Sequence, residues 1–148
     1  AAEASGSASI EEENSYISFQ DEAYQNEFLR RVNNERAKAG LKPVQLGDSN
    51  HNSAAQERAE EIATVNSHVR PNGTKWYTVL SEYGVTDAAA GENAAWGSVS
   101  PEEVVNAWMN SEGHRANILD PEARAMGVGY YYNSSSAWGH QWIQLFTK

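Results

Sequence analysis

The 148 residues have the length of one ordinary domain, and a hydrophobic fraction of 40% is enough for a single core. A formal net charge of −9 opposes polyanions, so nucleic acid and anionic lipid surfaces are not expected partners. The chain has no cysteine, which excludes disulfides, thiol catalysis and thiolate metal sites.

Residues 1–20 are small and polar and contain the acidic run Glu11–Glu13. This composition predicts a flexible acidic tail or linker, with the folded domain spanning residues 21–148. Such a start is typical of a mature terminus after processing or of an interdomain linker. No apolar run approaches the roughly 18 residues of a membrane span.

Helical periodicity begins after the tail. Tyr24, Phe28 and Val32 recur every four residues, and Gly40 marks the predicted end of a first helix. Asp48 or Ser49 is the predicted N-cap of a second helix that ends near residue 66. Its inner stripe consists mostly of small side chains: Ala54, Ala55, Arg58, Ala59 and Ile62.

A short third helix is predicted between the turn at residues 71–73 and Gly84. Residues 91–96 predict a strand, and Ser100 and Glu103 form a predicted capping box at the start of the next helix, with Pro101 in its first turn. Residues 126–132 and 141–146 predict a hairpin. Helices followed by late strands indicate an α+β sandwich.

Three residues stand out as carriers of chemistry. His68 and His114 are predicted to lie in loops, where functional side chains concentrate. Glu92 interrupts a small, apolar strand, and strand alternation places Asn93 on the opposite face. Two alternatives remain open: the histidines are structural or merely exposed, and Glu92 faces solvent from an edge strand.

Signature motifs of common enzyme classes are missing. The sequence contains no HExxH, Walker loop, GxSxG, dinucleotide fingerprint or EF-hand spacing. Ser111 lies three residues from His114, but a hydroxyl near a histidine is no triad without a third group. Enzymatic activity is therefore left open by the motifs.

Four ordered blocks carry a family resemblance: GENAAWG at 91–97, VVNAWMNSEGHRANIL at 104–119, GVG at 127–129 and WIQLF at 142–146. With Ser67-His68 upstream, residues 24–147 resemble the CAP superfamily, of the SCP-like or pathogenesis-related-1 type, in a bacterial, cysteine-free form. The resemblance implies a secreted, extracellular or cell-surface protein. It also implies an α-β-α sandwich with a small antiparallel sheet, of three or four strands, between helices.

The resemblance further implies a large cleft that holds two histidines and one or two glutamates. Carried over residue by residue, these are His68, Glu92 and His114, with Glu112 as a fourth. Family members often have their second acidic residue where this chain has Ser111, so Glu112 departs from the family pattern by one position.

Two imidazoles and a carboxylate suit Zn²⁺ or another divalent cation, with waters completing the shell. We therefore expect His68, His114 and Glu92 as metal ligands, and Glu92, Glu112, Trp96 and Asn93 as ligand-binding residues. The expected ligand is a small molecule, a lipid or a cell-envelope component. The expected function is a ligand- or metal-binding module.

Two alternatives belong to other functional classes. In a metal-assisted or acid/base hydrolase, Glu92 would activate a water held by His68 and His114, which makes these three the candidate catalytic residues. In a signalling or host-interaction protein, exposed loops such as residues 133–138 would act instead. Neither the oligomeric state nor the identity of the ligand follows from the sequence.

Overall fold

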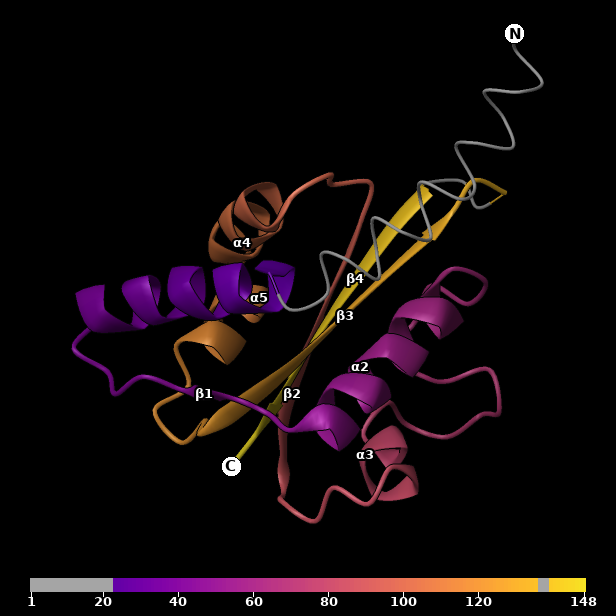
Figure 1. The fold of residues 1–148 in the computed structure, drawn as a ribbon, viewed down its shortest axis with the longest axis horizontal. Coiled ribbons are helices and arrows are strands. Elements are labelled where there is room, and N and C mark those ends of the chain that lie inside the picture. The colour runs from indigo at the N-terminus through magenta and orange to yellow at the C-terminus, as the bar shows by residue number, and fades with distance from the viewer. Residues whose placement is uncertain (1–22, 136–138) are drawn as a thin grey trace, which may run out of the picture.

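The computed structural model describes residues 23–135 and 139–148, so the predicted tail at 1–20 lies outside the described residues. A helix over residues 23–38 begins this part of the chain. It is followed by β1 (Gln45–Leu46), α2 (Ser49–Ile62), α3 (Thr78–Glu82), β2 (Ala89–Trp96), α4 (Pro101–Met109), α5 (Glu112–Ile118), β3 (Ala125–Asn133) and β4 (Gly139–Thr147) (Figure 1).

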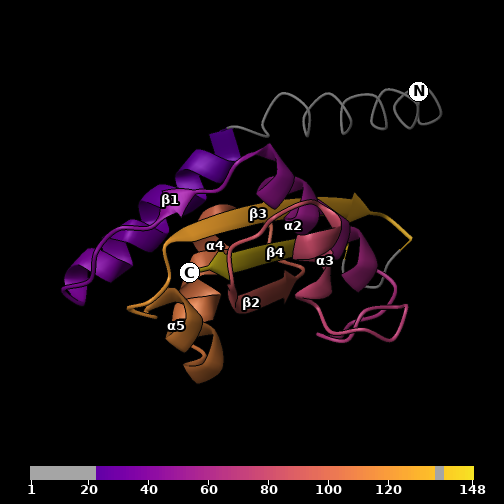
Figure 2. The ribbon, with the colours of Figure 1, turned by 90° about the horizontal axis from the view of Figure 1, so that it is seen from below.

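One four-stranded sheet, in the order β1-β3-β4-β2, separates two layers of helices. Helices α2 and α3 cover one face, while the helix over 23–38, α4 and α5 cover the other (Figures 1 and 2). Each face has its own hydrophobic core. The α+β class and the α-β-α sandwich are thus confirmed, but β1, which sequence reasoning missed, pairs in parallel with β3, so the sheet is not wholly antiparallel.

Helix α2 lies directly against β3 because two strand residues lack side chains. A Cβ atom at Gly127 would lie 2.5 Å from the ring of His51, and one at Gly129 would lie 2.3 Å from the carbonyl oxygen of Ala55. From the same helix, Asn52 Oδ1 accepts the N–H of Val128 at 3.1 Å, and Gln56 Oε1 accepts that of Tyr130 at 3.0 Å. These two side chains thus accept hydrogen bonds from backbone N–H groups of β3 beyond the end of the short β1.

Side chains from the opposite layer occupy the other edge of the sheet. Trp108 of α4 donates its indole N–H to the carbonyl of Ala94 at 3.0 Å. Asn117 of α5 donates to the carbonyl of Glu92 at 3.3 Å. Because these carbonyls belong to the edge strand β2, the contacts fix α4 and α5 beside the strand that carries Glu92.

Three features of the helices differ from the sequence-based prediction. Asp48 caps α2, as predicted, but the helix ends at Ile62 rather than near residue 66. Ser100 caps α4 by accepting the N–H of Glu103, whereas the carboxylate of Glu103 accepts from Val99 rather than from Ser100. The segment around His114, expected to be a loop, forms the short helix α5.

Replacing Trp108 with Phe should destabilise the fold by roughly 2 kcal/mol. Trp108 is 1% exposed, and the change leaves both a void and an unpaired carbonyl at Ala94. Urea denaturation followed by circular dichroism measures the loss. As the control, Tyr77→Phe alters a side chain that is 44% exposed, and its effect should stay within about 0.5 kcal/mol. Equal losses in the two variants would contradict this account of Trp108.

Candidate functional site

Glu92 lies in the edge strand β2, yet its side chain is fully buried. Strand alternation directs it toward α2, where Arg58 has no exposed surface either. Arg58 donates Nε–H to Glu92 Oε2 at 2.7 Å and Nη2–H to Oε1 at 2.9 Å. The alternative of a solvent-facing Glu92 is therefore wrong, because this bidentate ion pair compensates for the burial of its charge.

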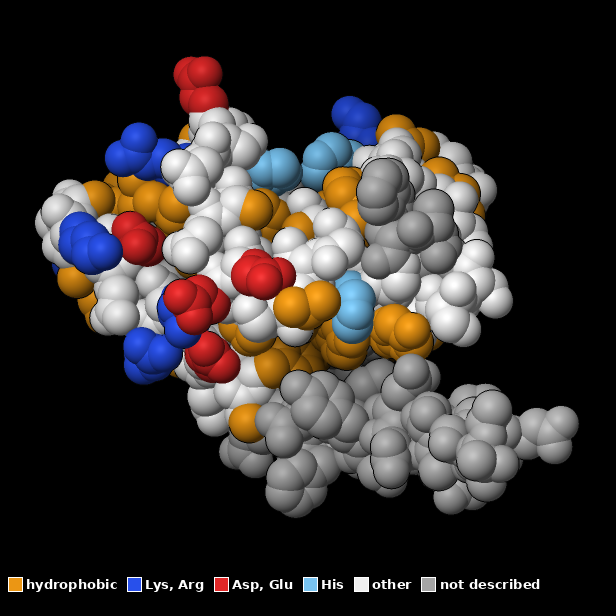
Figure 3. All heavy atoms as spheres, turned by 90° about the horizontal axis from the view of Figure 1, so that it is seen from above, with side chains coloured by type: hydrophobic (Ala, Val, Ile, Leu, Met, Phe, Trp, Pro, Cys, Tyr) orange, Lys and Arg blue, Asp and Glu red, His pale blue; other side chains and the backbone are white. Residues whose placement is uncertain are grey.

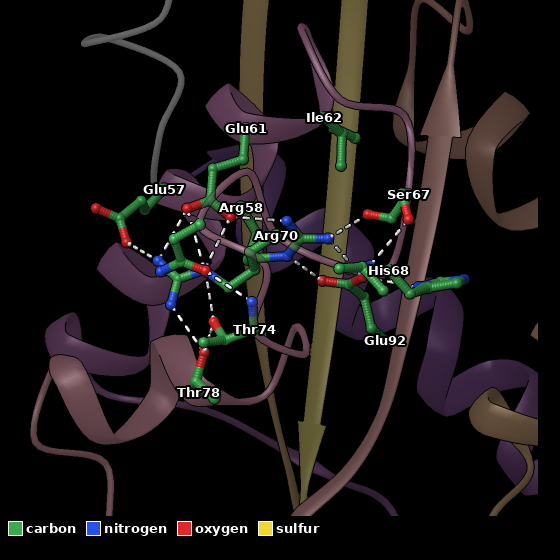
Figure 4. Close-up of polar contacts among 12 residues, drawn as sticks. Glu57, Arg58, Glu61, Ile62, Ser67, His68, Arg70, Thr74, Thr78 and Glu92 are labelled. Carbon is green, nitrogen blue, oxygen red and sulfur yellow. Dashed lines mark hydrogen bonds and ion pairs between the residues drawn. The ribbon is translucent and has the colours of Figure 1, made fainter.

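His68 contacts the same carboxylate from the loop that follows α2. Its Nδ1 lies 2.8 Å from Glu92 Oε1, and its side chain is 59% exposed (Figure 4). An ionised carboxylate only accepts hydrogen bonds, so Nδ1 is the donor. The Nε2 atom of His68 is then the nitrogen left for chemistry.

The Arg58–Glu92 ion pair is part of a network of ion pairs that extends away from His68. Glu61 accepts from Arg58 Nη1 at 2.7 Å and from Arg70 Nη2 at 2.8 Å. Arg70, which is 4% exposed, also pairs with Glu57 at 2.9 Å and with Glu82. This network of ion pairs connects the loop of His68 to α2 and α3 (Figure 4).

His114 approaches from the other face of the sheet, in the first turn of α5. Its carbonyl accepts from Asn93 Nδ2 at 3.1 Å, and Asn93 Oδ1 accepts from Asn117 at 2.9 Å. The ring centroids of His114 and Trp108 lie 6.5 Å apart. Asn93 is thus a fully buried residue that fixes the backbone of α5.

The surroundings of His68 and His114 move their pKa values in opposite directions. The hydrogen bond to Glu92, helped by that residue's charge, raises the pKa of His68 above 6.5, although partial burial and Arg58 oppose the rise. Partial burial lowers the pKa of His114, and the charge on His68 lowers it further. His114 therefore loses its proton at a lower pH than His68 does.

The two remaining predicted site residues, Glu112 and Trp96, have no described contact with His68, Glu92 or the ring of His114. Glu112 is exposed at the start of α5, and Trp96 is half-buried with its indole N–H 3.4 Å from the carbonyl of Ile62. In the described part of the chain, no group of three or more His, Asp or Glu side chains is placed to hold a metal ion.

Two cavities that are lined by described residues lie away from the predicted site residues. One, of about 430 Å³, lies between the helix over 23–38 and α4, and the other, of about 790 Å³, is lined by β1, the start of β3 and Lys148. Neither is lined by His68, Glu92 or His114, so the large cleft implied by the resemblance is not one of these cavities. Figure 3 shows histidine side chains reaching the surface on one face of the molecule.

Sequence reasoning missed the two buried arginines of this site. Arg58 was assigned only to the inner stripe of α2, and Arg70 was not singled out. A signal did exist for Arg58, since a charged residue on a stripe of alanines needs a buried partner. The sequence could not identify that partner, because Glu92 lies 34 positions away.

An NMR titration of the metal-free protein should find the midpoint of His68 above 6.5 and that of His114 below it. In Glu92→Gln, the His68 midpoint should fall, because the carboxylate that stabilises the imidazolium is gone. The contribution of charged His68 to stability is thus complete below about pH 6.5 and is lost as pH rises through the raised folded-state pKa. An unchanged His68 midpoint in Glu92→Gln would contradict this assignment.

Comparison with known proteins identifies relatives of the chain. The model of the CAP, cysteine-rich secretory protein, family matches residues 29–146. The protein YkwD of Bacillus subtilis (strain 168) is 41% identical over 123 residues, and the membrane protein YlbC of the same bacterium is 32% identical over 107 residues. The matches cover 82% and 71% of this chain but only 47% and 31% of those proteins, so the chain spans less than half of each relative.

Solved structures agree with the family match. An extracellular SCP-domain protein from Bacillus anthracis has a TM-score of 0.72 and 25% identity over 83% of this chain and 39% of its own. An outer surface protein from Borrelia burgdorferi has a TM-score of 0.71 and 20% identity, over 89% and 94% of the two chains. Within residues 23–135 and 139–148, every helix is too short or too polar to cross a membrane. The chain belongs to the CAP, cysteine-rich secretory protein, family, although it has no cysteine.

Proposed function

We propose that this CAP domain is a binding module in which His68 and His114 hold a divalent cation such as Zn²⁺ beside a small ligand, lipid or cell-envelope component. The hydrogen bond of 2.8 Å between His68 Nδ1 and Glu92 carries the proposal. A carboxylate on one imidazole nitrogen orients the ring and makes the other nitrogen a better metal ligand.

In this proposal the two protein ligands of the ion are the imidazoles of His68 and His114. His114 keeps a neutral imidazole at neutral pH because its pKa is lowered by burial and by His68. Both oxygens of Glu92 already accept hydrogen bonds, so Glu92 orients His68 rather than binding the ion. Two imidazoles are fewer than the three protein ligands usual for catalytic zinc, which favours modest, exchangeable binding. When bound, the cation supplies a Lewis acid for an oxygen of the ligand.

The names of similar structures support a location outside the cell. One neighbour is described as an extracellular protein and another as an outer surface protein. We therefore propose that this domain is secreted or held at the cell surface, where exchange of metal and ligand with the medium is direct.

A hydrolase is the second candidate, and one observation favours it. The pKa of His68 is raised and that of His114 is lowered, which is the pattern of an acid and a base sharing one site. In that case His114 accepts a proton and charged His68 donates one. A loss of turnover in Glu92→Gln would support the hydrolase. The third candidate, signalling through residues 133–138, falls partly on residues 136–138, outside those described.

Zinc titration by isothermal calorimetry at pH 7.5 tests the binding module. We expect saturable binding to the wild type and none to His68→Ala/His114→Ala, because both protein ligands are removed. The matched control is His140→Ala, since the imidazole of His140 contacts the hydroxyl of Tyr130 in β3, and it should bind as the wild type does. Equal binding by the wild type and the double variant, or none by the wild type, would refute the metal proposal.

A further inference from the structure

We infer that Arg58 is the positioning residue of the His68–Glu92 pair: its guanidinium fixes both the carboxylate and the peptide that carries His68. The imidazole therefore keeps its proton on Nδ1 and presents Nε2 outward. Only the expected effect of Arg58 on zinc affinity rests on the proposed function.

The first step concerns the carboxylate. A glutamate carboxylate turns easily about its last torsion, which would move Oε1 away from His68. Arg58 prevents this rotation, because Nε and Nη2 hold the two oxygens of Glu92 at 2.7 and 2.9 Å. The planar fork of a guanidinium matches a carboxylate in this bidentate manner. Oε1 thus stays directed at His68 Nδ1.

The second step concerns the backbone. The same Nη2 group donates to the carbonyl of Ser67 at 2.8 Å, and Ser67 immediately precedes His68. One planar group therefore holds the carboxylate that the imidazole meets and the peptide from which the imidazole extends (Figure 4). The separation between His68 and Glu92 is set by Arg58 rather than by the loop alone.

The third step is that Arg58 itself is fixed. Its Nη1 donates to Glu61 at 2.7 Å, and Glu61 is held in turn by Arg70. Arg58 has no exposed surface, so water does not compete for these contacts. Lysine has a single compact donor group and cannot span Glu92, Glu61 and the Ser67 carbonyl together.

The consequence is a choice of tautomer. Neutral imidazole carries its one proton on either nitrogen, and the partner of one nitrogen decides which. A fixed, acceptor-only carboxylate at Nδ1 selects the form with Nδ1–H, which leaves the lone pair on Nε2. A mobile carboxylate selects less strongly.

The test measures the tautomer of His68 without metal, by long-range ¹H–¹⁵N correlation spectra at a pH where the imidazole is neutral. We expect the wild type to carry Nδ1–H almost entirely and Arg58→Lys to show a mixture of both forms. Zinc affinity of Arg58→Lys should fall about tenfold, the size of effect that outer partners of metal-binding histidines have. Arg58→Gln, which keeps one donor toward Glu92, replaces it if Arg58→Lys does not fold, with the same expected mixture.

Arg36→Lys is the matched control. Arg36 is 1% exposed and donates to the carbonyls of Lys42, Ile118 and Asp120, so its loss also weakens buried contacts, but away from His68. The control should keep the wild-type tautomer. Wild-type His68 protonated on Nε2, an unchanged tautomer in the Arg58 variant, or equal mixtures in both variants would overturn the inference. The expected tautomers without zinc binding would refute only the metal proposal.

Discussion

The site depends on one buried ion pair, that of Arg58 with Glu92. Burying either charge alone costs several kcal/mol, and removing one partner of such a pair is strongly destabilising. Here both side chains have no exposed surface, and their two hydrogen bonds join α2 to the edge strand β2. Arg58 also donates to the carbonyl of Ser67, and this hydrogen bond connects the loop of His68 to α2 and β2. The position of His68 is therefore a consequence of how the charge of Glu92 is compensated.

The edge position of β2 explains how residues from opposite layers meet. Successive side chains of a strand face opposite sides, so Glu92 faces α2 while Asn93 faces α5. In the middle of a sheet, neighbouring strands would keep the two sides apart. At this edge, the loop of His68 contacts Glu92 and the first turn of α5 contacts Asn93, so both lie beside the same strand, and the charge of His68 lowers the pKa of His114. The edge is kept from pairing with other strands because Trp108 and Asn117 occupy its carbonyls.

Local patterns predicted most of the elements, because caps, glycine stops and periodicity are properties of neighbouring residues. Asp48 as the cap of α2 and the opposite faces of Glu92 and Asn93 are examples. The two-residue β1 was not predicted, since its pairing with β3 joins residues about 80 positions apart. Helix α5 was missed because Gly113 suggested a loop, and tertiary contacts outweigh that weak local preference. The family resemblance brought His68, Glu92 and His114 together, but it said nothing of Arg58.

The hydrogen bonds that Glu92 accepts limit the chemistry that the site can perform. Its two oxygens accept three hydrogen bonds, from Arg58 and from His68, so it is poorly placed to take a proton from water as the sequence-based hydrolase hypothesis requires. In both proposals, that of a metal site and that of an acid/base pair, the atoms that act are the Nε2 of His68 and the ring of His114. A metal ion needs both imidazoles neutral, whereas an acid/base pair needs His68 charged. Because Glu92 favours the charged form of His68, the two proposed activities exclude each other at this nitrogen, and the proposed metal site requires a pH above the raised pKa of His68.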